Sequence, residues 1–188
     1  VKDRFVRPRP SVQLKQDEES CLILVEHPTQ KGVYVAQNYY DAIPKANNQN
    51  FAKEVETIKR SAKLLTRQMD GLKSKDAGER LLTTALVITR YRTPVGAAPK
   101  TENVSAEESK LLLTNLAEAD WTAGGGRFGF MMSPQSIFFR LGVTDKDGWK
   151  PTPGTNIADA AKAWLKDNAG KYRVQRFARP DAGISVEP

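Results

Sequence analysis

Cysteine, histidine and long apolar runs are all scarce in this chain of 188 residues. Cys21 is the only cysteine and His27 the only histidine. One cysteine excludes an intrachain disulfide framework. One cysteine and one histidine also cannot supply the four ligands of a structural zinc site. No stretch approaches the ~20 apolar residues that cross a bilayer. We therefore expect neither a bound metal nor a membrane partner.

Catalytic patterns are equally sparse. Cys21 and His27 lie six residues apart in a predicted strand, which at ~3.3 Å per residue separates them by about 20 Å, too far for a direct dyad. The stretch GGGRFG at 124–129 lacks the GK[ST] ending of a phosphate loop, and it precedes a strand where such a loop would follow one. We expect a binding protein with no catalytic residues and no cofactor, not an enzyme.

Positive charge is abundant. The 29 Lys and Arg residues outweigh 22 Asp and Glu, giving a formal net charge of +7. An excess of this sign favours polyanionic partners, nucleic acid above all.

The first third of the chain predicts strands. The segment FVRPRPSVQLK, residues 5–15, is proline-rich and basic, and indicates an arm or edge strand that carries Arg7 and Arg9. Residues 21–27 and 33–40, CLILVEH and VYVAQNYY, predict a hairpin because they are rich in β-branched and aromatic residues.

The clearest predicted helix spans about 50–69. Its apolar residues recur every three or four positions and form one stripe: Phe51, Val55, Ile58, Ala62, Leu65 and Met69. The other side carries five cations, Lys53, Lys59, Arg60, Lys63 and Arg67. These are either a phosphate-binding ridge or a solvated face that complements the helix dipole, and the solvated face is favoured.

Two further elements are predicted between 80 and 120. Residues 80–93, RLLTTALVITRYRT, favour a long strand with Arg90 and Arg92 on one face. Ser105 and Glu108 have the spacing of a capping box, so residues 105–120 predict a helix or a mobile helical insertion.

Residues 126–142, GRFGFMMSPQSIFFRLG, change period in the middle. The first half alternates like a half-buried strand, whereas Ser133 and Pro134 form a helix start. Ile137, Phe138 and Leu141 then share a helical face, and Gly142 is suited to a left-handed stop.

The end of the chain predicts a helix over 157–168 and a basic strand over 171–180, KYRVQRFARP, with four cations and no acid. Such a strand is typical of surfaces that track a nucleic-acid backbone. The order of elements indicates an α+β chain of two related halves.

The segment 120–142 resembles part of the plant Whirly proteins, in which a turn containing Asp and Trp leads to a strand and a Ser-Pro helix start. The matching residues are Asp120, Trp121, Phe130, Ser133, Pro134 and Ile137. Residues 80–96 and 168–183 are similar to the flanking strands of that pattern. The insertion from about 97 to 119 and the missing lysine-glycine-lysine motif favour the kinetoplastid mitochondrial guide-RNA-binding proteins, which share the Whirly fold.

This resemblance implies a single Whirly-like domain over 1–188, with halves meeting near 79 and 80. Each half would be a twisted antiparallel sheet followed by a helix, and identical or paralogous subunits would form a tetramer in the mitochondrial matrix. The implied function is to grip single-stranded RNA by its backbone and promote annealing of guide RNA to messenger RNA during RNA editing.

Nine cations are the predicted RNA contacts: Arg90, Arg92, Arg127, Lys171, Arg173, Arg176 and Arg179, with Arg7 and Arg9 as auxiliaries. They would contact phosphate and ribose with little base specificity. Two alternatives remain open. One is a Whirly-type regulator that binds single-stranded DNA, and the other is a structural subunit of a mitochondrial ribonucleoprotein.

Overall fold

The computed structural model describes residues 14, 16–27, 30–35, 42–94, 100–122 and 133–178. The chain divides into two compact units, Val1–Lys59 and Arg60–Pro188. This boundary lies inside a helix, whereas the predicted halves meet at 79 and 80. The single domain of two related halves stays a prediction.

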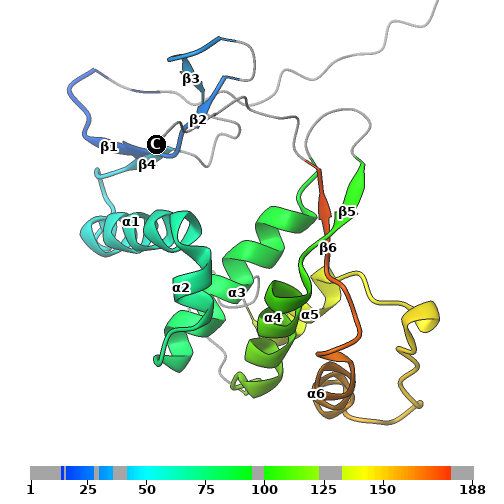
Figure 1. Cartoon of the computed structure of the whole chain (residues 1–188). Helices are drawn as coiled ribbons and strands as arrows, with labels where there is room; N and C mark the ends of the chain where they lie inside the picture. The colour runs from blue at the N-terminus through cyan, green and yellow to red at the C-terminus, as the bar shows by residue number, and fades with distance from the viewer. Residues whose placement is uncertain are drawn as a thin grey trace, which may run out of the picture. The chain divides into compact units, whose positions relative to one another are not determined.

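The first unit contains two short antiparallel pairs among its described residues (Figure 1). Strand β1, Ser20–Leu22, pairs with β4, Ala42–Pro44, and β2, Val25–Glu26, pairs with β3, Tyr34–Val35. The second pair confirms the inner part of the predicted hairpin. Residues 36–41 lie outside the described residues, as does the basic arm apart from Leu14.

Helix α1, Phe51–Thr66, confirms most of the helix predicted over 50–69. It begins in the first unit and ends in the second. The helix stops because Arg67 leaves helical geometry, with φ −125° and ψ 48°, and a separate helix, α2, resumes at Gln68–Leu72.

The second unit is a group of helices beside one strand pair (Figure 1). Its helices after α2 are α3 at Ala77–Arg92, α4 at Ala106–Glu118, α5 at Pro134–Arg140, the 3-10 helix η2 at Asp145–Asp147 and α6 at Ile157–Asn168. Strand β5, Thr101–Asn103, pairs antiparallel with β6, Gln175–Phe177. The coarse prediction of mixed α and β structure is confirmed.

The strand predicted over 80–93 is wrong, because this segment is helix α3. Its buried residues follow a helical period, with Thr84, Ile88 and Tyr91 on one side. The Asp76 side chain caps the helix by accepting a hydrogen bond from the Glu79 backbone N–H at 2.7 Å. Burial of this face and the cap outweigh the β propensity of Thr, Val and Ile.

Helix α4 forms the middle of the core, and it confirms the helix predicted from the capping box. Ser105 accepts a hydrogen bond from the Glu108 backbone N–H, and Leu112, Leu113 and Leu116 are fully buried. The helix packs against both α3 and α6. The segment that the family pattern treats as an insertion is therefore central to this unit.

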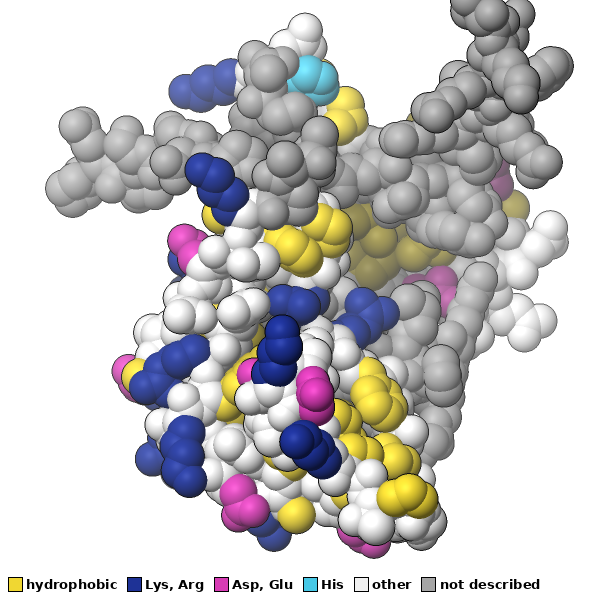
Figure 2. Space-filling model, turned by 90° about the vertical axis from the view of Figure 1, so that its right-hand side faces the viewer, with side chains coloured by type: hydrophobic (Ala, Val, Ile, Leu, Met, Phe, Trp, Pro, Cys, Tyr) yellow, Lys and Arg dark blue, Asp and Glu magenta, His cyan; other side chains and the backbone are white. Residues whose placement is uncertain are grey.

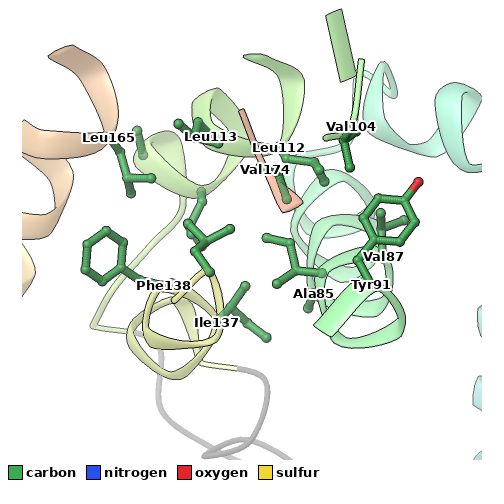
Figure 3. Packing of buried hydrophobic residues seen from close by; sticks show 14 of the residues in the cluster. Ala85, Val87, Tyr91, Val104, Leu112, Leu113, Ile137, Phe138, Leu165 and Val174 are labelled. Carbon is green, nitrogen blue, oxygen red and sulfur yellow. The ribbon is translucent and has the colours of Figure 1, made fainter. Parts of the chain in front are cut away.

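Helix α5 brings the main aromatic side chain into the same core (Figure 3). Ser133 caps it, Pro134 occupies its first turn, and Gly142 ends the segment at a φ of +74°, as predicted. Phe138 is fully buried, with its ring centroid 4.7 Å from that of Trp149 and 5.8 Å from that of Trp164. The strand predicted before α5 lies outside the described residues.

Helix α6 has the predicted bounds and buries Ala161, Trp164 and Leu165. The terminal strand is confirmed over three residues only, as β6. Its partner β5 was not predicted, and Glu102 faces Arg176 across the pair.

Candidate nucleic-acid interface

Five of the nine predicted RNA contacts lie within the described residues. Arg90 and Arg92 are in the last turn of α3, Arg176 is on β6, and Lys171 and Arg173 follow α6. The other four, Arg7, Arg9, Arg127 and Arg179, lie outside the described residues. Arg90 and Arg92 were predicted to lie on one face of a strand. This prediction is wrong, because both residues belong to helix α3.

Two of the five cations are held between α3 and β6. The Arg92 Nε donates to the Arg140 carbonyl oxygen at 3.1 Å, and its guanidinium lies 5.5 Å from the Phe177 ring centroid. The Arg176 Nε lies 2.6 Å from the Glu102 Oε1, and its guanidinium is 5.7 Å from the Tyr91 ring centroid. The Glu102 carboxylate raises the pKa of Arg176. Both guanidinium groups thus bind the protein itself.

The remaining three differ in exposure. The half-buried Arg173 donates from Nη1 to the carbonyl oxygens of Gly170, Lys171 and Tyr172 at 3.4, 3.5 and 3.4 Å. Arg90 and Lys171 are exposed, and within the described part of the chain their side chains form no ion pair. Of the predicted contacts that the structure describes, these two are the ones available to a ligand.

Opposite charges are interspersed on the face shown in Figure 2. Lys and Arg side chains lie among Asp and Glu on the described surface of the second unit. Such mixing dilutes the local positive potential.

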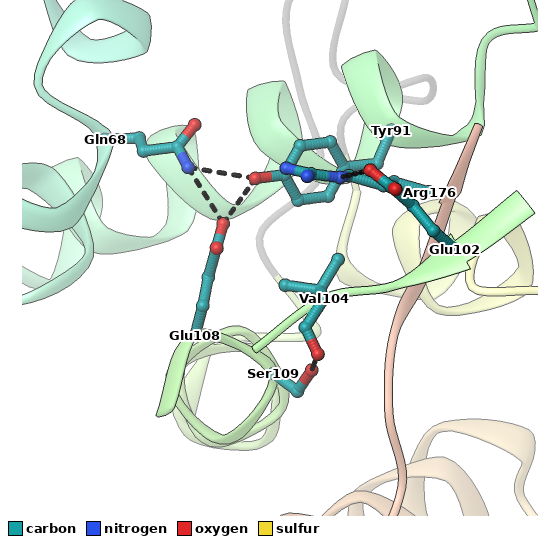
Figure 4. Close-up of polar contacts among 7 residues, drawn as sticks. All are labelled: Gln68, Tyr91, Glu102, Val104, Glu108, Ser109 and Arg176. Carbon is teal, nitrogen blue, oxygen red and sulfur yellow. Dashed lines mark hydrogen bonds and ion pairs between the residues drawn. The ribbon is translucent and has the colours of Figure 1, made fainter. Parts of the chain in front are cut away.

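A buried polar network lies beneath Arg176 (Figure 4). The Tyr91 hydroxyl donates to the Glu108 Oε1 at 2.5 Å, and the Gln68 Nε2 donates to both of these oxygens at 2.9 Å. Burial, followed by the Glu108 carboxylate, raises the pKa of Tyr91. These groups satisfy one another inside the core, so they join α2, α3 and α4 and present no open site.

A more accessible group of cations lies around a hollow where α1, α2 and α3 meet. We call it the basic hollow. Its volume is about 460 Å³, and the residues that line it are Arg60, Lys63, Leu64, Arg67, Asp70, Gly71, Ser74 and Glu79. All of them belong to the second unit.

Local backbone geometry forms the basic hollow. The break at Arg67 turns α2 away from α1, and the carbonyl oxygen of Arg67 accepts hydrogen bonds from the Asp70 and Gly71 amides. Gly71 lets α2 approach α3, since a Cβ there would lie 2.5 Å from the Thr83 Oγ1. The Arg80 Nη1 donates to the Ser74 carbonyl at 3.0 Å and so holds the loop between α2 and α3.

The charge of the basic hollow is positive. Three cations, Arg60, Lys63 and Arg67, stand against two carboxylates, Asp70 and Glu79, which leaves a formal +1. Residues 60–69 contain these three cations and no acid. Among the described residues no ion pair joins them to a carboxylate. The arrangement is suited to hold an anion such as a phosphate group.

In comparisons with protein families, curated proteins and solved structures, nothing matches this chain. Within the residues that the structure describes, no three His, Cys, Asp or Glu side chains come together in a way that could hold a metal ion. The same part of the chain contains no helix that is long and apolar enough to span a membrane.

Sequence reasoning found the cations of the basic hollow but not the hollow itself. The five cations of the predicted helix were interpreted mainly as a solvated face. Spacing along one helix does not reveal that Gly71 brings α2 close to α3, whose Glu79 lines the hollow together with residues of α1. A glycine flanked by helical residues was the available signal.

Proposed function

We propose that this chain binds single-stranded RNA through the sugar-phosphate backbone, and that the basic hollow is the principal contact. The observation that carries the proposal is the acid-free run that lines the hollow with Arg60, Lys63 and Arg67, which have no ion-pair partners among the described residues. Positive groups left unpaired at a surface gain most from phosphate, since their binding releases counterions.

The spacing of these cations suits the sugar-phosphate backbone of a single strand. At a rise of 1.5 Å per residue, Arg60 and Lys63 are about 4.5 Å apart along α1, and Arg67 follows directly after its last residue, so the three cations can contact neighbouring phosphates of one strand. No aromatic side chain is among the described residues that line the hollow. Binding would therefore contact the backbone and leave bases unstacked, with little sequence preference.

The resemblance to guide-RNA-binding proteins adds finer parts to this proposal. Bases left outward are free to pair, so the proposed activity is annealing of guide RNA to messenger RNA in mitochondrial RNA editing, by a tetramer of Whirly-like subunits in the matrix. These parts depend on the resemblance alone. Helix α3 occupies the place of a strand in the family pattern, which weighs against the Whirly fold.

The test measures the affinity of a fluorescent single-stranded RNA from 50 to 200 mM salt. Wild-type protein should bind less tightly as salt rises, and the triple variant Arg60→Gln, Lys63→Gln, Arg67→Gln should bind weakly. Because each lost phosphate contact lowers the log–log salt slope by about 0.7, the slope should fall by about 2. A strand-annealing assay with complementary RNAs then tests the finer activity.

A matched control removes three exposed lysines elsewhere, Lys146→Gln, Lys150→Gln and Lys166→Gln. It changes net charge equally, so it should retain most of the salt slope if the hollow is the contact. A third variant, Arg90→Gln with Lys171→Gln, measures the contribution of the predicted residues that remain available. Salt-insensitive binding, or equal loss in the hollow and control variants, would contradict the proposed surface. Tighter binding to DNA of the same sequence would instead support a single-stranded DNA-binding regulator.

A further inference from the structure

The basic hollow contains acceptors as well as donors, which a site for phosphate alone would not need. Asp70 on α2 and Glu79 on α3 line it together with the three cations named above. A carboxylate beside a bound phosphate repels it, because like charges at close range oppose binding. The carboxylates therefore match a ligand that brings hydroxyl donors along with its negative charge.

The two carboxylates differ in what they already bind. The Glu79 Oε2 accepts a hydrogen bond from the Ser74 hydroxyl at 3.0 Å, and that hydroxyl also accepts one from the Asp76 amide at 3.2 Å. Glu79 is thus bound in part by the loop between α2 and α3. The Asp70 side chain is exposed, and the structure gives it neither a hydrogen bond nor an ion pair within the described residues. Of the two carboxylates that line the hollow, Asp70 is the one without a bound partner among the described residues.

A ribonucleotide unit has the required chemistry. Its phosphate matches Arg60, Lys63 and Arg67, and its 2′-hydroxyl can donate to a carboxylate, whereas a deoxyribonucleotide has the same phosphate and no such donor. The volume of about 460 Å³ lies within the ~300–1,000 Å³ range of small-molecule sites, which is the size expected for one nucleotide unit.

We propose that Asp70 accepts a hydrogen bond from a ribose 2′-hydroxyl and thereby makes the basic hollow select RNA over DNA. The inference rests on the proposed function, since it needs a backbone bound in the hollow. It assigns specificity to a residue outside the predicted contacts and outside the cations themselves.

The selectivity follows from two opposing effects of one side chain. For DNA, the Asp70 carboxylate only repels the phosphates. For RNA, the hydrogen bond to the 2′-hydroxyl offsets this repulsion. We expect RNA to bind roughly five- to tenfold more tightly than DNA of the same sequence, the effect of one charge-assisted hydrogen bond at an open site.

The experiment compares RNA, DNA and 2′-O-methyl RNA of one sequence, with wild-type protein and Asp70→Ala. Methylation removes the donor and keeps the phosphates, so wild-type protein should bind the methylated strand about as weakly as DNA. Asp70→Ala should bind DNA more tightly than wild type does, and its RNA-to-DNA affinity ratio should fall close to one. Asp167→Ala, an exposed carboxylate on α6, is the charge-matched control and should keep the wild-type ratio.

The outcomes separate this inference from the proposed function. If RNA and DNA both bind in a salt-dependent way but with equal affinity, or if the ratio survives in Asp70→Ala, the role of Asp70 is overturned while backbone binding stands. If neither strand binds wild-type protein, both are overturned. Should Asp70→Ala fail to fold, the methylated strand on wild-type protein still decides, because undiminished affinity for it would contradict the hydrogen bond.

Discussion

Arg176 on β6 and Glu102 on β5 face each other across the antiparallel pair, with the Arg176 Nε 2.6 Å from the Glu102 Oε1. The Arg176 guanidinium also lies over the Tyr91 ring of α3. A residue first predicted to contact RNA thus joins a strand pair to a helix.

Reversing the charges of Arg176 and Glu102 tests whether their ion pair stabilises the fold. Arg176→Glu should lower the free energy of unfolding by about 1 kcal/mol, because two carboxylates would face each other and the ring contact would be lost. The double variant Arg176→Glu, Glu102→Arg should recover part of that loss. Urea denaturation measures both, and an unchanged midpoint in Arg176→Glu would show that the pair contributes nothing. Both side chains are nearly half exposed, at 43% and 48%, which keeps the expected effect small.

Two adjacent phenylalanines on α5 should respond very differently to truncation. Phe138 is fully buried among aromatic rings, so Phe138→Ala should lower the free energy of unfolding by about 3–5 kcal/mol. Phe139 is 52% exposed and serves as the matched control, with an expected loss below about 1 kcal/mol. Thermal or urea unfolding of both variants tests the assignment, which would be wrong if the two losses were equal.

Gly71 controls the approach of α2 to α3. In Gly71→Ala the new methyl group would lie 2.5 Å from the Thr83 Oγ1, so the helices must separate at a cost of about 1–3 kcal/mol. The same movement would widen the basic hollow and weaken RNA binding. Gly170→Ala, where no atom lies within 4 Å of the added Cβ, should leave both stability and affinity unchanged. Equal behaviour of the two variants in unfolding experiments would refute the close approach.

The buried tyrosines predict how stability changes in alkali. Burial raises the pKa of Tyr91 and of Tyr172, so as pH rises through about 10 each phenol ionises in the unfolded chain before it does in the folded one. The unfolded state then binds fewer protons, and the free energy of unfolding falls above pH 10 after being insensitive to these groups below it.

Tyr91→Phe checks this dependence. The variant should lose about 1–2 kcal/mol at neutral pH, because Glu108 loses a hydrogen-bond donor, and should show a shallower decline in alkali. Tyr172→Phe is the companion variant. Unfolding midpoints between pH 7 and 11 provide the measurement, and an identical alkaline slope in wild type and both variants would contradict the raised pKa values.

Local capping signals predicted the helices well where side chain and backbone act within a few residues. Ser105 with Glu108 located the start of α4, and Ser133 with Pro134 located α5. Asp76 and Glu79 have the same spacing before α3, but this signal was not used, and the strand over 80–93 was predicted from its β-branched residues alone. Fourteen residues is also long for a strand, whose usual length is about five or six residues.

The strand pair and the candidate site depend on contacts far apart in the sequence. Thr101–Asn103 has no alternating apolar pattern, since all three residues are exposed, so nothing local identifies β5. The cations of α1 were visible in the sequence. Their significance depends on Gly71 meeting Thr83 and on which carboxylates are already bound, and neither fact follows from residue spacing.

The pairing of β5 with β6 has a consequence for folding during synthesis. Next to the two strands, the Val104 N–H donates a hydrogen bond to the Val174 carbonyl oxygen at 2.8 Å. More than half of the second unit lies between these two residues along the chain. Contacts this distant form slowly, because a long loop must close first. On the ribosome, helices α3 to α6 would emerge before β6 is available, and the buried side of α4 would wait for its last neighbour, Val174.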